Sequence, residues 1–160
     1  MDPEKPDAAP ARPKRRFEPA DGDYERRVRE SYATQTFMQH IGAELGRIEP
    51  GYCEILLPFD RRLCQQDGFL HAGVTTTLAD NACGYAAYTL MPEGSRVLSV
   101  EFKMNLLRPA SGESFAARAE VIKPGRNLTV LEGTVYALSG EEGEKVEKEI
   151  AFMVATMTRA

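Results

Sequence analysis

Residues 65–73 combine two glycines, a histidine and side-chain amides directly before a segment with helical periodicity. Gly68 and Gly73 permit tight backbone turns. The first free amides of a helix that begins near Ala72 point outward, with the positive end of the helix dipole behind them. Such a helix end can polarise a carbonyl or hold an oxyanion. The same glycines also suit a plain capping turn, and His71 also suits a structural hydrogen-bonding role, so the spacing alone leaves both interpretations open.

Asp80 is the second candidate for chemistry, because it lies in the middle of the predicted helix. Asp80 lies well beyond the first turn of this helix, where the helix dipole would favour a carboxylate. No Lys or Arg lies three or four residues away to pair with it. A carboxylate in that setting is expected to be solvated, to be bonded to another chain, or to serve as a base or nucleophile. We favour a catalytic role.

The interval between His71 and Asp80 limits how the two can act together. On a regular helix it amounts to about two and a half turns, about 180° of rotation and about 13 Å of rise, so one chain cannot aim both at one small substrate. A shared site needs two subunits whose helices run antiparallel across a two-fold axis. The narrow helix side with Gly84 and Ala87 suits that approach, because Gly84 inside a helix costs about 1 kcal/mol unless something comes close there.

The elements that must position these residues are one long helix, expected over 74–91, and about six strands. The strands follow from alternating or apolar runs bounded by turn residues, at 44–48, 52–58, 96–107, 113–123, 128–138 and 146–158. The short turns at 109–112, 124–127 and 139–143 predict that the last four strands form an antiparallel meander. In the third strand we expect Leu98, Val100, Phe102, Met104 and Leu106 on one face, a scheme that Ile150, Phe152 and Val154 repeat in the last strand. The sequence predicts an α+β fold in which a curved antiparallel sheet wraps a central helix.

The first twenty residues differ from the rest. Five of the ten prolines fall among them, and Phe17 is their only large hydrophobic residue, which predicts a disordered tail over 1–20. Residues 21–41 fit one or two short helices, and 21–160 are expected to form a single domain.

Composition excludes several classes of function. Twenty basic and twenty-four acidic residues give a net charge of −4, so nucleic acid is not expected as a partner. No apolar run approaches the length of a membrane span, which excludes membrane insertion. Cys53, Cys64 and Cys83 have no metal-ligand spacing and the chain begins without a signal peptide pattern, so we expect a cytoplasmic protein with reduced cysteines, no metal and no cofactor.

Residues 65–80, with the segments 99–110 and 125–128, resemble the hotdog-fold acyl-CoA thioesterases of the PaaI type. The resemblance covers about residues 42–159. It implies a long central helix wrapped by a strongly curved sheet, dimers that join their sheets edge to edge, and commonly a dimer of dimers.

The resemblance also implies roles for individual residues. Asp80 would be the general base or nucleophile, the backbone amide of Ala72 would bind the thioester oxygen, and Ser99 would assist from the strand beside Asp80. Gln65, rather than Gln66, would support the carbonyl or the water. His71-Ala72-Gly73 stands where the family usually has His-Gly-Gly, a change that a backbone donor survives. The residues that would meet coenzyme A and substrate are Arg108, Lys123, Arg126, Asn127 and Gly84.

The resulting hypothesis is an acyl-CoA thioesterase that uses water, a positioned carboxylate and a polarised carbonyl. A hotdog hydratase or dehydratase is an alternative, but such enzymes usually place a histidine and an aspartate closer together than His71 and Asp80. A non-catalytic acyl-CoA binder or acyl sensor is a second alternative. Residues 1–40 contain no convincing DNA-binding helix-turn-helix, which disfavours the sensor.

Overall fold

The computed structural model describes residues 16–140 and 146–160, which form three α-helices, one short 3₁₀ helix and six strands. The elements in chain order are α1 (Tyr24–Ala33), α2 (Thr36–Ile41), β1 (Glu44–Glu49), β2 (Tyr52–Pro58), η1 (Arg61–Leu63), α3 (Ala72–Tyr88), β3 (Val97–Leu106), β4 (Ser114–Pro124), β5 (Leu128–Ser139) and β6 (Val146–Arg159).

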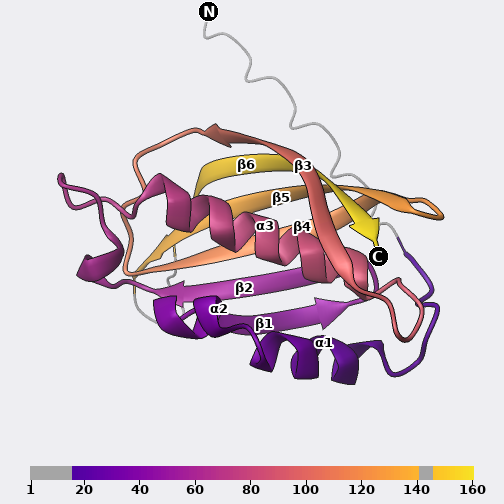
Figure 1. Cartoon of the computed structure of the whole chain (residues 1–160). Helices are drawn as coiled ribbons and strands as arrows, with labels where there is room; N and C mark the ends of the chain where they lie inside the picture. The colour runs from indigo at the N-terminus through magenta and orange to yellow at the C-terminus, as the bar shows by residue number, and fades with distance from the viewer. Residues whose placement is uncertain (1–15, 141–145) are drawn as a thin grey trace, which may run out of the picture.

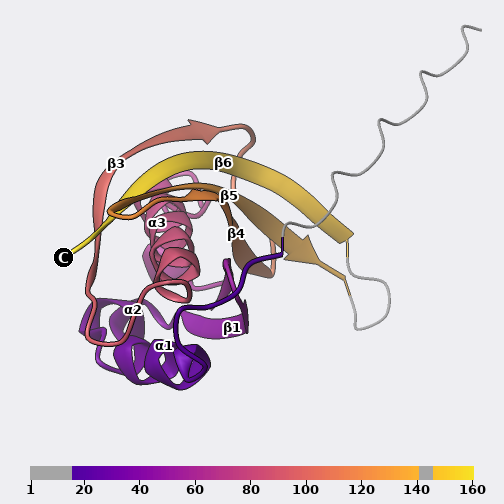
Figure 2. The same cartoon turned by 90° about the vertical axis from the view of Figure 1, so that its right-hand side faces the viewer.

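The six strands form one sheet with the order β1-β2-β4-β5-β6-β3, and every neighbouring pair is antiparallel. The sheet curves around α3, so that β3 and β1 come down on opposite sides of the helix, with α1 and α2 beside β1 (Figures 1 and 2). This confirms the predicted α+β class and the hotdog arrangement. No helix of the described segments is long and apolar enough to cross a membrane.

The prediction of a four-strand meander is wrong for β3. Only β4, β5 and β6 follow one another in the sheet, whereas β3 pairs with β6 and β4 pairs with β2. The connection through residues 107–113 passes the N-terminal end of α3 (Figure 1), where Leu70 N donates to Ala110 O at 3.0 Å. A short connection that contains turn residues can therefore cross the open side of a curled sheet instead of closing a hairpin.

A bulge in β3 overturns the expected assignment of its faces. Ser99 is opposite Met157 and Phe102 is opposite Ala155, with a register shift between Ser99 and Glu101. Directly opposed residues share a face, and both β6 partners are fully buried, so Ser99 and Phe102 point to the same inner side although one number is odd and the other even. Leu98 lies on the outer face.

The prediction that Ile150, Phe152 and Val154 share one face of β6 is wrong at Ile150. The buried residues of this strand are mainly its small and flexible ones, and Val154 is 37% exposed. A second irregularity, between Val135 and Tyr136 of β5, leaves Ile150 buried and without an opposed residue in β5. The side of β6 that packs on the helix consists of Ala151, Met153, Ala155 and Met157.

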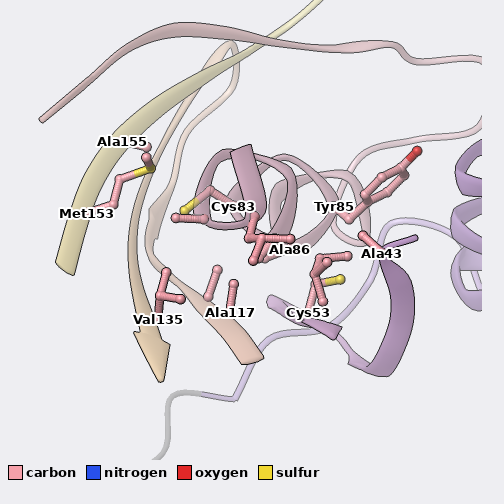
Figure 3. Packing of buried hydrophobic residues seen from close by; sticks show 14 of the residues in the cluster. Ala43, Cys53, Cys83, Tyr85, Ala86, Ala117, Val135, Met153 and Ala155 are labelled. Carbon is pink, nitrogen blue, oxygen red and sulfur yellow. The ribbon is translucent and has the colours of Figure 1, made fainter. Parts of the chain in front are cut away.

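The core lies between α3 and the inner face of the sheet, and the contact is close. Figure 3 shows Cys83 and Ala86 of α3 among the buried side chains of the surrounding strands. A Cβ at Gly133 of β5 would lie only 3.0 Å from Cys83 Sγ, so this strand approaches the helix where it carries no side chain. Small residues on both elements thus bring the sheet close enough to hold α3 in a fixed position.

The N-terminal segment differs from the expected tail at one residue. Residues 1–15 of the predicted tail, and residues 141–143 of the predicted turn at 139–143, lie outside the described part of the chain. Phe17 is partly buried and packs against the core. Its ring covers Gly51 in the β1–β2 turn, where a Cβ would lie 2.5 Å from a Phe17 ring carbon. The expectation that residues 1–20 bury almost nothing is therefore wrong at Phe17.

Candidate active site

Asp80 lies on the third turn of α3, where it lines a cavity of about 410 Å³ between α1, α3 and β3. Ser99 Oγ donates a hydrogen bond of 2.6 Å to Asp80 Oδ1. Among the described residues, no cation forms an ion pair with this carboxylate and Ser99 is its only side-chain partner. Asp80 is thus a positioned carboxylate on the cavity wall, and its Oδ2 has no hydrogen-bond partner among the described residues.

Cys83 lies one turn further along α3 and is the other potentially nucleophilic side chain nearby. It is completely buried. Burial raises the pKa of the Cys83 thiol, and the charge of Asp80 raises it further. A buried, protonated thiol is inert, so Cys83 is not a candidate nucleophile and Asp80 remains the candidate reactive group on this part of the helix.

The N-terminal end of α3 shows which backbone amide is free. His71 is the N-cap residue, and its Nδ1 accepts a hydrogen bond of 2.9 Å from Gly73 N. His71 O accepts from the amides of Val74 and Thr75. Within the described segments, the Ala72 amide alone remains without an acceptor in this first turn, which leaves it available to a substrate oxygen.

The same geometry explains the residue types of the His71-Ala72-Gly73 segment. A Cβ at Gly73 would lie 3.0 Å from His71 Nδ1 and 3.4 Å from Cε1, so a larger residue would require the capping imidazole to shift by a few tenths of an ångström. Ala72 is exposed, and its methyl group leaves its own amide in place. The structure therefore favours glycine at 73, where a side chain would require the His71 ring to shift, and accommodates alanine at 72.

Gln65 lies in the loop before α3 and comes close to this helix end. It lines a second cavity of about 300 Å³ together with Ala72 and Arg108. Its side-chain Oε1 accepts from Asp67 N, its side-chain Nε2 donates to Asp67 Oδ2 at 3.4 Å, and its backbone N donates to Phe69 O at 2.9 Å. Gln66 is exposed and does not line that cavity. The geometry thus favours Gln65 over Gln66 as the supporting amide.

The two cavities have no lining residue in common. One holds Asp80, Ser99 and Gly84, and the other holds Gln65 and Ala72. Ala72 and Asp80 are eight positions apart on one continuous helix, about 12 Å along its axis. A single chain therefore does not bring the two halves of the expected site together.

The expected close approach at Gly84 and Ala87 is only partly found. A Cβ at Gly84 would meet no atom within 4 Å, so this position faces open space in the cavity. Ala87 is completely buried inside its own chain, and the prediction that it faces a partner is wrong. Gly84 and Ala87 lie on different sides of α3. The sheet and its core residues cover more of the helix surface than the run of small side chains on α3 had suggested.

The four residues expected near coenzyme A lie at three places. Arg108 is exposed at the second cavity, where Nη1 donates to Glu149 O at 2.6 Å. Arg126 and Asn127, in the β4–β5 turn, line a third cavity of about 230 Å³ near the C-terminal end of α3. Lys123 is exposed at the end of β4 and lines none of these cavities.

Sequence reasoning missed part of the Asp80 cavity. Its wall includes Ser31 and Gln35 from the N-terminal helices, and Asn81, Tyr85 and Tyr88 from α3. Tyr85 could be assigned to the buried half of the helix from periodicity, but nothing in the spacing links residues 31 and 35 to a helix some fifty residues later. No group of three or more potential metal ligands occurs in the residues that the structure describes.

Comparisons with known proteins agree with this fold. Residues 67–144 match the family model described as thioesterase superfamily. The crystal structure of a thioesterase family protein from Silicibacter pomeroyi is 51% identical, with a TM-score of 0.80 over 85% of this chain and 97% of the other. The chain belongs to the thioesterase superfamily.

Two further relatives place this thioesterase within the superfamily. The proofreading thioesterase EntH of Klebsiella pneumoniae is 30% identical over 105 residues, which are 66% of this chain and 77% of that protein. The PaaI protein of E. coli has the same fold, with a TM-score of 0.73 at 18% identity over 86% of this chain and 94% of the other. The predicted resemblance is confirmed, and the protein is a thioester hydrolase.

Proposed function

We propose that this thioesterase hydrolyses acyl-CoA to a free acid and coenzyme A, with Asp80 as the general base. The observation that carries the proposal is the Asp80 carboxylate, which Ser99 orients at 2.6 Å on the wall of a cavity that can hold an acyl group. A carboxylate without a paired cation, next to a ligand-sized cavity, is suited to taking a proton from water.

The proposed reaction proceeds by attack of water on the thioester carbonyl carbon. Asp80 Oδ2 takes a proton from the water as its oxygen bonds to carbon, and the Ala72 amide stabilises the resulting oxyanion. Gln65 orients the water or the carbonyl, and His71 and Gly73 hold the Ala72 amide in place. The carbon–sulfur bond then breaks, and the coenzyme A thiolate takes up the proton that Asp80 accepted.

We further propose that each site combines two subunits of a homodimer, because Asp80 and Ala72 line separate cavities of one chain. β3 supports this arrangement as an edge strand of the sheet with exposed apolar side chains, among them Leu98, Val100 and Phe102. Such an edge is suited to pairing with the same strand of a second copy. Two dimers would then assemble as a tetramer.

Coenzyme A would be held by cationic groups at the strand ends. We propose that Arg108, Arg126 and Lys123 contact its phosphates, with Asn127 and Gly84 also on the substrate path. Arg and Lys suit phosphate through charge and donor geometry. The three cysteines form no disulfide, which supports the proposal that the enzyme works in the cytoplasm.

The test is thiol release from a panel of aliphatic and aryl acyl-CoA thioesters, with EDTA present. We expect turnover of at least one thioester, because the proposed mechanism uses only water and side chains of this chain. Measurable binding without turnover across the panel would favour the acyl-CoA binder or sensor instead. A single turnover in ¹⁸O-labelled water separates base from nucleophile: label appears in the acid product at once if Asp80 acts as a base.

A further inference from the structure

The loop before α3 is closed at its base and turns sharply at its tip. Cys64 and Leu70 form an isolated antiparallel bridge at the base, and Gln65 N donates to Phe69 O at 2.9 Å. At the tip Gly68 N donates to Gln65 O at 3.0 Å, and Gly68 has a φ of +86°, a left-handed conformation that favours glycine. Both main-chain polar groups of Gln65 are therefore bonded within the loop, and its backbone is held in place.

Asp67 contacts both ends of the Gln65 side-chain amide. The backbone N of Asp67 donates to Gln65 Oε1, and Gln65 Nε2 donates to Asp67 Oδ2 at 3.4 Å. An N–H group needs an acceptor, so the first contact identifies which end of the amide is the oxygen. The second hydrogen on Nε2 has no acceptor among the described residues. Since Gln65 lines the cavity beside Ala72, this remaining N–H is the group that it can offer to a substrate.

The two contacts with Asp67 fix different properties of the amide. The last torsion of a glutamine side chain is only weakly restricted, so a bond to Oε1 alone leaves the amide plane free to turn. The second bond, from Nε2 to the carboxylate, removes this freedom. The Asp67 carboxylate therefore sets the direction of the remaining N–H of Gln65.

The surroundings of Asp67 leave its carboxylate to this loop. The residue is exposed, and no ion pair within residues 16–140 and 146–160 involves it. Its Oδ2 also accepts from Gln66 Nε2 at 3.3 Å. Asp67 lines neither the Asp80 cavity nor the cavities beside Ala72 and Arg126. Its contact with the candidate site therefore runs through Gln65.

We propose that Asp67 is a positioning residue for thioester hydrolysis: its carboxylate fixes the plane of the Gln65 amide and so directs the remaining N–H towards the thioester group beside the Ala72 amide. The inference rests on the proposed function for the presence of a thioester there. No bond forms or breaks at Asp67, which separates its role from that of Asp80.

Two substitutions of Asp67 test this role, because both keep the backbone N–H that bonds Gln65 Oε1. In Asp67→Ala the acceptor for Gln65 Nε2 is lost, so kcat for the acyl-CoA of the panel that is hydrolysed fastest should fall by about fivefold, the effect of one net hydrogen bond. KM should stay within about twofold, since Asp67 lies outside the three cavities. Asp67→Asn keeps a side-chain oxygen as acceptor and should restore kcat to within about twofold of the wild type.

Gln66→Ala is the matched control. It removes the other amide that donates to Asp67 Oδ2, from a residue that is exposed and outside the cavity beside Ala72. The bond from Gln65 stays, so kcat should remain within about twofold of the wild type, as for an ordinary surface substitution. The thermal unfolding midpoint should be unchanged in all three variants, because residues 66 and 67 are both exposed.

Nuclear magnetic resonance of the Gln65 side chain reports the contact without turnover. The chain contains four glutamines, so in protein labelled with ¹⁵N only at the glutamine side chains, Gln65→Ala identifies the Gln65 signal. In Asp67→Ala the two Gln65 amide protons should shift, since one of them loses its acceptor. In Gln66→Ala they should shift far less.

The outcomes separate this inference from the proposed function. A Gln65 signal that shifts in Asp67→Ala, in a protein that hydrolyses no acyl-CoA, would support the contact and contradict the proposed function. An unchanged kcat in Asp67→Ala, or an equal loss in Asp67→Asn, would overturn the inference and leave the proposed function intact. A higher kcat in Asp67→Ala would also overturn it, because Asp67 would then compete with the substrate for the Gln65 amide.

Discussion

Ser99 Oγ on β3 lies 2.6 Å from Asp80 Oδ1 on α3, and this hydrogen bond joins the edge strand of the sheet to the middle of the central helix. A hydroxyl that donates to one carboxylate oxygen fixes the plane of the carboxylate. The other oxygen has no hydrogen-bond partner among the described residues and is held in one orientation. Asp80 and Ser99 form one functional unit in the proposed reaction, with Asp80 reacting and Ser99 positioning it.

Asp80→Asn tests the reacting member of this pair. The amide keeps the shape and volume of the side chain but cannot take a proton, so kcat should fall by at least about a hundredfold with acyl-CoA affinity largely retained. Steady-state kinetics and calorimetric binding check this. Ser99→Ala, which keeps the base and loses its orienting bond, should reduce kcat less than Asp80→Asn does; an equal loss would contradict the assignment.

Subunit mixing tests whether the site is shared. Asp80→Asn and Gln65→Ala are each expected to be inactive, but one of the two sites in a mixed dimer would be intact. Under exchange conditions, heterodimers should show about half the wild-type rate if the sites are independent. Confirmed exchange by native mass spectrometry without recovered activity would mean that the site is completed within one chain.

The helix N-terminus can be tested with two neighbouring substitutions. Gly73→Ala puts a Cβ 3.0 Å from His71 Nδ1 and should displace the imidazole and the amide that it orders. We expect kcat/KM to fall by at least about tenfold. Ala72→Gly keeps the free amide and should stay within about twofold of the wild type. Similar losses in both variants would refute the role of the Ala72 amide.

The ion pair between Arg118 and Glu147 predicts a pH-dependent stability. Arg118 Nη1 and Nη2 each lie 2.7 Å from a Glu147 oxygen, and these hydrogen bonds lower the pKa of Glu147. A lowered carboxyl pKa contributes stability above the ordinary carboxyl pKa and loses it as pH falls through the folded-state pKa. Since Glu147 is 40% exposed, Glu147→Gln should cost about 0.5 kcal/mol near neutral pH.

The difference in unfolding free energy between the wild type and Glu147→Gln should shrink towards zero in acid. There the wild-type carboxyl group is protonated and, like the glutamine, carries no charge. Thermal unfolding of both proteins between neutral and strongly acidic pH, at one protein concentration, measures the change. Lys148→Gln, on the neighbouring exposed position of β6, should show no such convergence. A constant difference across the pH range would rule out the ion pair as its cause.

The packing of the Phe17 ring predicts that the first described residues contribute to the stability of the fold. Its ring packs over Gly51 and the partly open β1–β2 turn. Phe17→Ala should lower the free energy of unfolding by about 1–2 kcal/mol, since part of a large apolar side chain becomes exposed. Glu18→Ala, at an exposed position, should leave urea unfolding unchanged. An unchanged midpoint in Phe17→Ala would restore the expectation of a tail with nothing to bury.

The sequence was sufficient for those parts of the fold that depend on local pattern. The helix around Asp80, the hairpin at Pro50-Gly51 and the six strands all follow from periodicity and turn residues. The helix begins at Ala72 rather than Val74, because the side chain of His71 caps it. Local signals of this kind report what each segment does by itself.

Long-range relationships could not be obtained in that way. The pairing of β3 with β6 depends on how far the sheet curls around α3, and alternation within a strand contains no information about its partner. For the same reason Gln35 and Ser31 had no recognisable signal, since they reach the Asp80 cavity only through the packing of the N-terminal helices beside α3. Asp80 could be identified from the sequence, because a carboxylate inside a helix without a nearby cation conflicts with its local surroundings.

The bulge at Val100 makes the spacing within β3 a constraint on how this gene can change. Ser99 and Phe102 reach the inner side from positions of opposite parity, and only the extra residue between them reconciles the two. Loss or gain of one codon between 99 and 102 would turn either the serine or the whole apolar series outward. A substitution in this stretch leaves the register of β3 in place, whereas a single-residue insertion or deletion changes which side chains face α3.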